Sequence, residues 1–330
     1  MMRGVPRFVT LGLLTLLIAM PAVGCAASRS WPARPVALVV PFSAGGPTDT
    51  VARILANAMS KTLGKSVVVE NRTGAGGTIG AGYVARAKKD GYTFLLHHNG
   101  MATSRALYRD LPFDALNSFE YIGQVVDVPM TLVGRVDLPA NDMKSLAAYL
   151  RANRDKINLA HAGPGAASHM CAMQLRRTLG LQLTTVPFQG TAPAMTALVG
   201  GHVDLLCDQT TQTLSYIRAK KVKMYGVATR TRIGSLPQAA TLIEGGLKDF
   251  EVIVWHGIYA PKGTPKAALD GFGNALRKAL KDPEVIRRFK ELGGEPVDDE
   301  AVTPAGLRDL LQAEITKWTP IIQSESGYLD

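Results

Sequence analysis

Short β-rich runs alternate with helical patterns along most of the chain. PVALVVPF is followed by TDTVARILANAMSKTL and SVVVEN by TIGAGYVARAK, and the same order returns at INLAHAG and SHMCAMQLRRTLG. Parallel neighbouring strands need a crossover connection, which is usually a helix. The alternation therefore predicts an α/β fold with parallel-rich sheets.

Two longer extended stretches, at 121–135 and 250–260, interrupt this alternation. The chain has 330 residues, which suits two domains better than one small core. We interpret both stretches as strands that cross between domains, with a first domain at 31–130 plus 250–330 and a second at 131–249. A ligand site is then expected in the cleft between the two domains.

The net charge of +10 raises the question of nucleic-acid binding. The lysines and arginines are scattered, however, and only 6% of the residues are aromatic. Nucleic-acid-binding proteins usually gather basic residues into one patch or stripe. We therefore expect a basic, soluble surface and no nucleic-acid partner.

The N-terminus has the order of a secretory signal. Arg3 and Arg7 flank the apolar stretch FVTLGLLTLLIAM, and the small residues of PAVGCAAS follow. This order predicts a signal peptide over residues 1–24 and a periplasmic mature protein. AVGC also resembles a lipobox, in which Cys25 would be lipidated after cleavage, so the mature protein is expected either free or lipid-anchored.

Two further cysteines, Cys171 and Cys207, lie within the expected mature chain. Export permits a disulfide between them. The interpretation favoured here is two buried free thiols that pack as small apolar residues. A disulfide depends on the distance between the α-carbons, which the sequence does not give.

The stretch PFSAGGPTDT, from Pro41 to Thr50, follows an apolar strand and precedes a helical pattern. A glycine-rich turn at the end of a strand lets backbone N–H groups approach a ligand, and the helix behind it presents unpaired N–H groups and the positive end of its dipole. Thr48 or Asp49 is the expected N-cap. This turn is suited to an anion or a polar group, although an ordinary capped turn would look the same.

A second turn in the other predicted domain has the same order. In LAHAGPGAASHMCAMQL a strand ends near Ala162, the turn Gly163-Pro164-Gly165 follows, and Ser168 stands at the start of a helix. Two such turns would face each other across the cleft, where a carboxylate could accept charge-assisted hydrogen bonds from both. NRTGAGGTIG and VPFQGTAPAM form a third and a fourth turn at strand ends.

Motifs for catalysis are absent or lie in the wrong context. GAGYVA, over residues 80–85, lies inside a helical pattern rather than at a strand-to-helix turn. The chain has no G-x-S-x-G, H-E-x-x-H or C-x-x-C. Asp49 and Asp208 could act as an acid–base pair, but without a nucleophile or cofactor motif beside them, binding or capping roles fit better. We expect no enzyme activity, no cofactor and no metal.

Several stretches together resemble the Bug family, the extracytoplasmic solute receptors of tripartite tricarboxylate transporters. They occur in family order and are PFSAGGPTDTVAR, VVVENRTGAGGTIGA, DGYTFLL, LAHAGPGAASH, VPFQGTAPAMTALVGGHVDLLCD and GIYAPKGTP. The resemblance covers nearly all of the chain from Trp31. It implies a type II-like, two-domain periplasmic binding protein, monomeric, that closes over a small carboxylated or amide-bearing organic solute and delivers it to integral-membrane transporter subunits.

The resemblance also implies which residues contact the solute. They are Phe42, Ala44, Gly45 and Asp49 in the first turn; Gly163, Gly165, Ala166, Ala167 and Ser168 in the second; Phe188, Gly190 and Thr191 in the fourth; Asp208 at a strand end; and Asn99 and Thr103 after the third strand. His97 and His98 stand where hydroxyl residues are commoner. Together with the apolar pair Ala166–Ala167, they argue against a highly charged ligand such as citrate.

Two alternatives stay open at the level of sequence. One is an exported enzyme for a small carboxylated molecule, with His169 and Asp208 in acid–base roles. The other is a binding module of a sensing system. An enzyme would convert its ligand, whereas a receptor returns it unchanged, and membrane subunits encoded nearby would favour transport over sensing.

Overall fold

The structure is a computed structural model that describes Met1, Met2, Gly4 and residues 31–325. Apart from those first three residues, the predicted signal peptide lies outside the described part, as does the predicted lipidation site Cys25. Among the described residues, no helix combines the length and the apolar character needed to cross a membrane.

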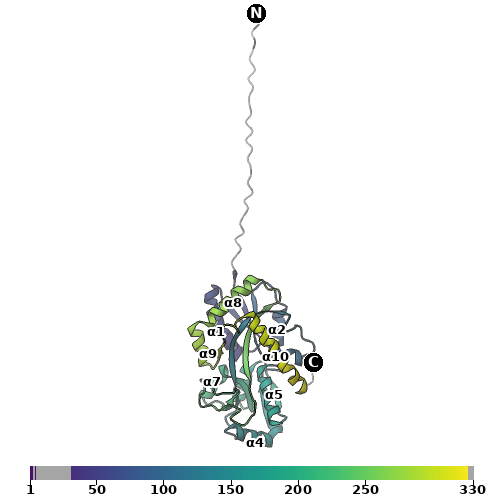
Figure 1. Ribbon diagram of the computed structural model, residues 1–330, viewed down its shortest axis with the longest axis vertical. Coiled ribbons are helices and arrows are strands. Elements are labelled where there is room, and N and C mark those ends of the chain that lie inside the picture. Colours follow the sequence, from purple (N-terminus) through teal and green to yellow (C-terminus); the bar gives the residue numbers. More distant parts are fainter. Residues whose placement is uncertain (3, 5–30, 326–330) are drawn as a thin grey trace. The chain divides into compact units, whose positions relative to one another are not determined.

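Strands and helices alternate as predicted (Figure 1). The strands are β1 (Val36–Val40), β2 (Val67–Asn71), β3 (Thr93–His98), β4 (Phe119–Gly134), β5 (Asn158–His161), β6 (Thr184–Pro187), β7 (Leu205–Gln209), β8 (Lys223–Val227), β9 (Ile253–Pro261) and β10 (Glu295–Pro296). The α-helices are α1 (Pro47–Leu63), α2 (Thr78–Ala85), α3 (Gly100–Leu107), α4 (Met143–Asn153), α5 (Ala167–Leu179), α6 (Thr191–Val199), α7 (Thr210–Arg218), α8 (Lys266–Leu280), α9 (Pro283–Glu291) and α10 (Pro304–Glu325).

The strands form one sheet in the order β2-β1-β3-β9-β4-β7-β5-β6, and β8 and β10 also pair with β4. β1 is parallel to β2 and β3, and β5 is parallel to β6 and β7. The α/β class and the helical crossovers are therefore confirmed. The sheet is mixed rather than parallel throughout, because β9 runs antiparallel to β3 and β4, and β4 runs antiparallel to β7 and β8.

The long strand β4 joins the two halves of the sheet. Its residues Phe119–Pro129 pair with β9, and its residues Met130–Gly134 pair with β7 and β8. The chain returns near Val252, whose amide donates to the Ala228 carbonyl at 2.9 Å. These are the two extended stretches expected to cross between domains. Contacts group the residues from Trp31 onward as one unit, so the division into two domains stays a prediction.

The sequence of α1 explains why the first turn lies at the carboxyl end of β1. β1 is almost wholly buried, Gly46 is extended at the N-cap, and Pro47 fills the first helical position, where its missing N–H has no cost. Val51, Ile54, Leu55 and Ala58 recur on one face of the helix and are buried. The helix packs beside α8 and α9 (Figure 1). This burial holds the N-terminus of α1 at the carboxyl end of β1.

Cys171 on α5 and Cys207 on β7 form a disulfide, with their α-carbons 6.1 Å apart. The expectation of two free thiols is therefore wrong. α5 packs directly against β7, which brings together two cysteines that are 36 residues apart in the chain. Closing a loop of this length typically stabilises a fold by about 2–4 kcal/mol. The bond fixes α5, and with it the second turn, to the strand that carries Asp208.

Candidate functional site

Four turns converge at the ends of the strands. The second turn lies so close to the third that a Cβ atom added to Gly76 would stand 1.8 Å from the Pro164 carbonyl oxygen. The first turn meets the fourth, where the Ser43 amide donates to the Gln189 carbonyl at 3.1 Å. Thr103 also joins the second turn, because its hydroxyl donates to the Gly165 carbonyl at 2.7 Å. We call residues 41–50, 73–77, 162–168 and 188–192 the turn cluster.

Asp49 organises the first turn from inside. One carboxylate oxygen accepts from the Gly45 amide at 2.9 Å and from Arg53 Nε at 2.8 Å, and the other accepts from Asn71 Nδ2 at 2.9 Å. Burial raises the pKa of Asp49, but the hydrogen bonds from Arg53, Gly45 and Asn71 outweigh it and lower the pKa below its ordinary value. Asp49 is therefore an ionised support of the turn, while Ala44 and Gly45 beside it are exposed.

In the second turn the glycine amides already have acceptors. Gly163 N donates to His161 Nδ1, and Gly165 N donates to His169 Nδ1, both at 3.2 Å. The first amides of α5, at Ala167 and Ser168, lack an acceptor inside the helix, as at every helix start. The Ser168 hydroxyl oxygen accepts from Ala162 N at 2.8 Å, which leaves its hydrogen free to donate. The donors for an anion are thus the helix start and this hydroxyl.

Both histidines of the second turn are neutral. Burial lowers the pKa of His161 to about 4, and burial, the neighbouring His161 and Arg176 lower the pKa of His169 to about 3. The two rings lie 4.7 Å apart. Because each Nδ1 accepts a backbone N–H, each Nε2 carries the proton. His169 therefore supports the turn, and this arrangement does not favour the acid–base role considered for it.

Three more buried histidines lie behind the first turn. Burial, followed by the effect of His256, lowers the pKa of His97 to about 3. Burial also lowers the pKa of His98 well below its usual range and that of His256 to about 4. Phe42 stacks on the His98 ring with centroids 4.5 Å apart and meets His97 edge-on. The Thr48 hydroxyl oxygen lies 3.3 Å from His256 Nε2. Because their pKa values are lowered, the three histidines are neutral at pH 7.

Several buried polar atoms at the same strand ends have no hydrogen-bond partner. They are Ser43 Oγ, Asn99 Oδ1, both carboxylate oxygens of Asp208, Gln209 Oε1, Thr211 Oγ1 and His256 Nδ1. In folded proteins, nearly all buried polar groups are paired. Burial raises the pKa of Asp208 to about 7, and the Gln209 amide and Thr191 hydroxyl lower it only in part, without reaching hydrogen-bond geometry. The described residues contain no group of three or more His, Cys, Asp or Glu side chains that could hold a metal ion.

The remaining residues predicted to contact the ligand lie in or beside the turn cluster. Asn99 Nδ2 donates to the Ile253 carbonyl at 3.1 Å, and the Thr191 hydroxyl donates to Gln212 Oε1 at 3.1 Å. Phe188 is half-buried, and its amide donates to the His161 carbonyl at 2.8 Å. Gly190 lies against Ser43, because an added Cβ atom would stand 2.2 Å from Ser43 Oγ. Ala166 and Ala167 are buried at the start of α5.

Sequence reasoning missed three residues of the turn cluster: Ser43, Gly76 and Gln189. Ser43 and Gln189 join the first and fourth turns, and Gln189 also accepts from the Thr73 hydroxyl at 2.8 Å. Gly76 has a positive φ of 61° and no room for a side chain. The repeated glycines of NRTGAGGTIG were the available signal, because close backbone approach requires glycine.

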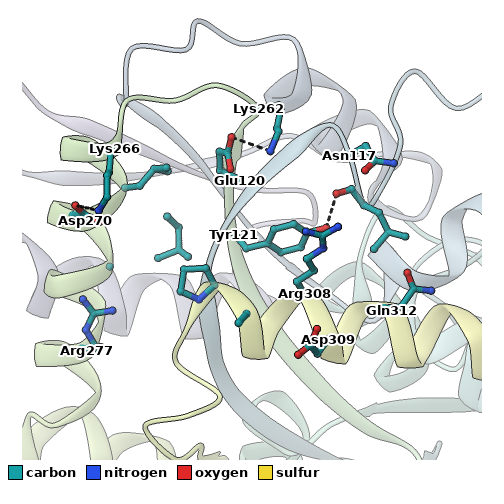
Figure 2. A pocket seen from close by; sticks show the side chains of 16 residues that line it. Asn117, Glu120, Tyr121, Lys262, Lys266, Asp270, Arg277, Arg308, Asp309 and Gln312 are labelled. Carbon is teal, nitrogen blue, oxygen red and sulfur yellow. Dashed lines mark hydrogen bonds and ion pairs between the residues drawn. The ribbon is translucent and has the colours of Figure 1, made fainter.

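A hollow with a volume of about 880 Å³ lies elsewhere (Figure 2). It is formed by the start of β4, the residues after β9, α8 and the first half of α10, and contains no residue of the turn cluster. Charged side chains surround it, and Lys262 pairs with Glu120 at 3.1 Å. Figure 2 shows the Arg308 guanidinium beside the Tyr121 ring. We call it the one-sided groove, because all of its walls come from the predicted first domain.

The family model described as "Tripartite tricarboxylate transporter family receptor" matches residues 51–326. The periplasmic binding protein BugD is 49% identical, with a TM-score of 0.87 over 89% of this chain and 98% of that protein. MatC from Rhodopseudomonas palustris, solved with bound malate, is 38% identical, with a TM-score of 0.85 over 88% and 100%. Another R. palustris protein, solved with adipate, is 30% identical, with a TM-score of 0.84 over 89% and 98%.

Proposed function

The chain belongs to the tripartite tricarboxylate transporter family receptors, which are periplasmic binding proteins and not enzymes, and from this premise we propose a specific function for it. It captures a small carboxylated or amide-bearing organic solute within the turn cluster and delivers it to integral-membrane transporter subunits. We further propose that a signal peptide over residues 1–24 directs its export, with Cys25 as a lipid anchor where the lipobox is processed.

The unpaired polar atoms in and beside the turn cluster carry this proposal. Ser43, Asn99 and Asp208 each bury at least one polar atom without a partner. An unpaired buried polar group costs about 1–3 kcal/mol, so several together at one place are hard to explain as ordinary core. A bound polar solute, with or without bridging water, would supply the missing partners.

One carboxylate of the solute is proposed to meet the start of α5. The free hydrogen of the Ser168 hydroxyl and the first amides of α5 are donors at a positive helix end. The starts of α1 and α6 approach from the first and fourth turns. The relatives solved with malate and adipate support a carboxylate ligand.

Closure of two domains is the proposed mechanism, with the second domain at 131–249. The contact of Gly76 with Pro164 and the hydrogen bond from Ser43 to Gln189 join turns of different predicted domains. A solute held by both sets of turns would stabilise this closed arrangement, because a ligand shifts an equilibrium by its differential affinity for the two states.

Isothermal titration calorimetry of the purified mature protein tests the proposal. The panel contains malate, adipate, aromatic acids, amino acids and amides, and we expect saturable binding of at least one carboxylate. Ser168→Ala should weaken that binding by about 1–3 kcal/mol, or roughly 5- to 150-fold. Ser145→Ala, which removes a serine hydroxyl at the start of α4, is the matched control and should leave the affinity unchanged.

Mass balance after incubation separates the receptor from an enzyme. A receptor returns its ligand chemically unchanged, so turnover of a bound acid would contradict the proposal. If Ser168→Ala binds the solute with unchanged affinity, the proposed position of the carboxylate at the start of α5 is wrong, even though the protein binds a solute.

A further inference from the structure

The first half of α10 shares an apolar cluster with β1, β3 and β9. Its second half lies beside α5 (Figure 1). Trp318 and Ile322 of α10 form one apolar cluster with Met170 and Met173 of α5. Ala106 and Leu107 of α3 belong to the same cluster. α3 and α10 fall in the predicted first domain and α5 in the second, so this cluster joins the two predicted domains directly beside the second turn, where Leu107 lies close to Gly165.

A hollow of about 560 Å³ lies next to this apolar cluster. One wall is α5, another is the end of α10, and a third is the segment that leads back to the first domain. Gln174 Nε2 on α5 donates to the Asp249 carbonyl at 3.2 Å, which ties two of the walls together. We call this hollow the two-sided groove, because moving α5 relative to α10 would take its walls apart.

The floor of the two-sided groove is apolar and its rim is basic. Met173 and Trp318 form the floor, each only 5% exposed. Arg177 and Lys248 stand on the rim and are exposed, and within residues 31–325 neither has a carboxylate at ion-pair distance. Asp249 is one rim carboxylate that also has no cation partner, so the unpaired charges on the rim sum to a positive value.

We propose that the two-sided groove is the surface through which the closed receptor docks on an acidic segment, with an apolar anchor, of the membrane transporter. This inference rests on the proposed function. A transporter served by such a receptor must distinguish the loaded receptor from the empty one. The one-sided groove is also basic but lies within one predicted domain, so closure leaves it unchanged. A surface built from both domains changes on closure and thereby reports occupancy.

The complementarity is specific in its chemistry. Two unpaired cations flank an apolar floor, so the partner segment is expected to carry carboxylates on both sides of a large apolar side chain. Such rim charges mainly accelerate association and select the partner, while a buried apolar anchor supplies most of the affinity. Arg230 and Lys317, which already pair with Glu251 and Glu314, contribute less.

The test is co-sedimentation of the mature receptor with proteoliposomes that carry the transporter membrane subunits, with and without 1 mM malate. The test variant is Arg177→Glu plus Lys248→Glu. The matched control is Arg277→Glu plus Arg308→Glu, which makes the same charge change in the one-sided groove.

A third arm tests closure. Gly76→Ala should impair closure, and Gly64→Ala is its control, because an added Cβ atom at Gly64 meets nothing within 4 Å.

We expect the test variant and Gly76→Ala to lose at least tenfold in binding to the proteoliposomes, while both controls retain it. Retained binding in the test variant would overturn the proposal, and so would an equal loss in the Arg277/Arg308 control, which would indicate general electrostatics. Equal sedimentation with protein-free vesicles would assign the attraction to lipid, and no binding by the wild-type protein would exclude docking here.

Calorimetry of the soluble variants keeps this result separate from the proposed function. The test variant should bind the solute within threefold of the wild-type affinity, because Arg177 and Lys248 lie outside the turn cluster. A receptor that binds no solute at all contradicts the proposed function, whereas one that binds solute normally but ignores the membrane subunits contradicts only the docking surface.

Discussion

The turn cluster and the one-sided groove of Figure 2 are opposite kinds of surface. The groove is large and open, and much of its charge is satisfied locally, as by Lys262 with Glu120 and Lys266 with Asp270. The buried histidines beside the turn cluster are neutral, and several buried polar atoms in and beside it have no partner. Because buried polar groups are normally paired, we expect the unpaired, desolvated groups, and not the larger hollow, to indicate the ligand site.

The largest predicted difference between the two regions is in their response to acid. His97, His98, His161, His169 and His256 have pKa values depressed by burial, so the unfolded chain binds more protons than the native protein below pH 6.5. The free energy of unfolding should therefore fall as the pH drops from 6.5 towards 4. Each histidine contributes up to about 1.4 kcal/mol per pH unit, so several together should give a steep loss of several kcal/mol.

Urea denaturation at pH 7.5, 6.5, 5.5 and 4.5 measures this dependence. Asp208 acts in the opposite direction, since its raised pKa makes the native state take up a proton between pH 7 and 4, and it should offset about one of the five histidines. His97→Gln is the comparison variant and should flatten the slope. A free energy of unfolding that is constant over this range would contradict the picture of buried neutral histidines.

The second prediction concerns the closeness of the turns. Gly76→Ala places a Cβ atom where the Pro164 carbonyl oxygen lies and also strains a positive φ of 61°. Solute affinity should fall about 100-fold, or ~3 kcal/mol, because the turns cannot meet. Gly64→Ala has a similar φ of 65° but open space around it, so it should cost about 1 kcal/mol of stability and leave the affinity unchanged. Equal calorimetric affinities for the two variants would break the comparison.

The sequence predicts the positions of the turns better than it predicts the hydrogen bonds within them. The four turns were predictable, because glycines between an apolar run and a helical pattern are a local signal. The partners of the turn amides were not. His161 and His169 precede and follow Gly163 and Gly165 in the chain, but that their Nδ1 atoms accept the glycine amides depends on ring orientation in the folded turn.

Long-range contacts explain the other differences. The disulfide of Cys171 with Cys207 depends on α5 packing against β7, and the approach of Gly76 to Pro164 depends on how two parts of the sheet are joined through β4. Neither is encoded within a short window of residues. The family resemblance was predictable because its motifs are local, and the family model confirms it.

The third prediction concerns Asp208, which we expect to lower the stability of the free protein and to contribute to solute binding. Its raised pKa of about 7 means that the buried carboxylate destabilises the free protein above pH 4. Asp208→Asn should raise the free energy of unfolding at pH 7 by about 1–3 kcal/mol, after the cost of burying an unpaired amide. That gain should disappear as the pH falls from 7 to 4, and solute affinity should fall at the same time.

Calorimetry and urea denaturation of Asp208→Asn give both quantities. The corresponding change in the one-sided groove is Glu120→Gln, where the carboxylate is partly exposed and pairs with Lys262 at 3.1 Å. Stability there should change by less than about 1 kcal/mol and solute affinity not at all. Loss of both stability and affinity in Asp208→Asn would make Asp208 an ordinary structural residue.

The smallest effect is predicted for Arg308→Ala in the one-sided groove. Among the described residues, its guanidinium has no carboxylate at ion-pair distance, and it lies beside Tyr121, as Figure 2 shows. Stability should change by about 0.5 kcal/mol or less, mainly through lost packing of the side-chain stem. Solute affinity of Arg308→Ala should stay within twofold of wild type. Arg53→Ala removes a 2.8 Å hydrogen bond to Asp49, which supports the first turn, and should therefore weaken solute binding several-fold. Calorimetry of both variants decides the point, because an equal loss in Arg308→Ala would place part of the solute site in the groove and remove the distinction between the two regions.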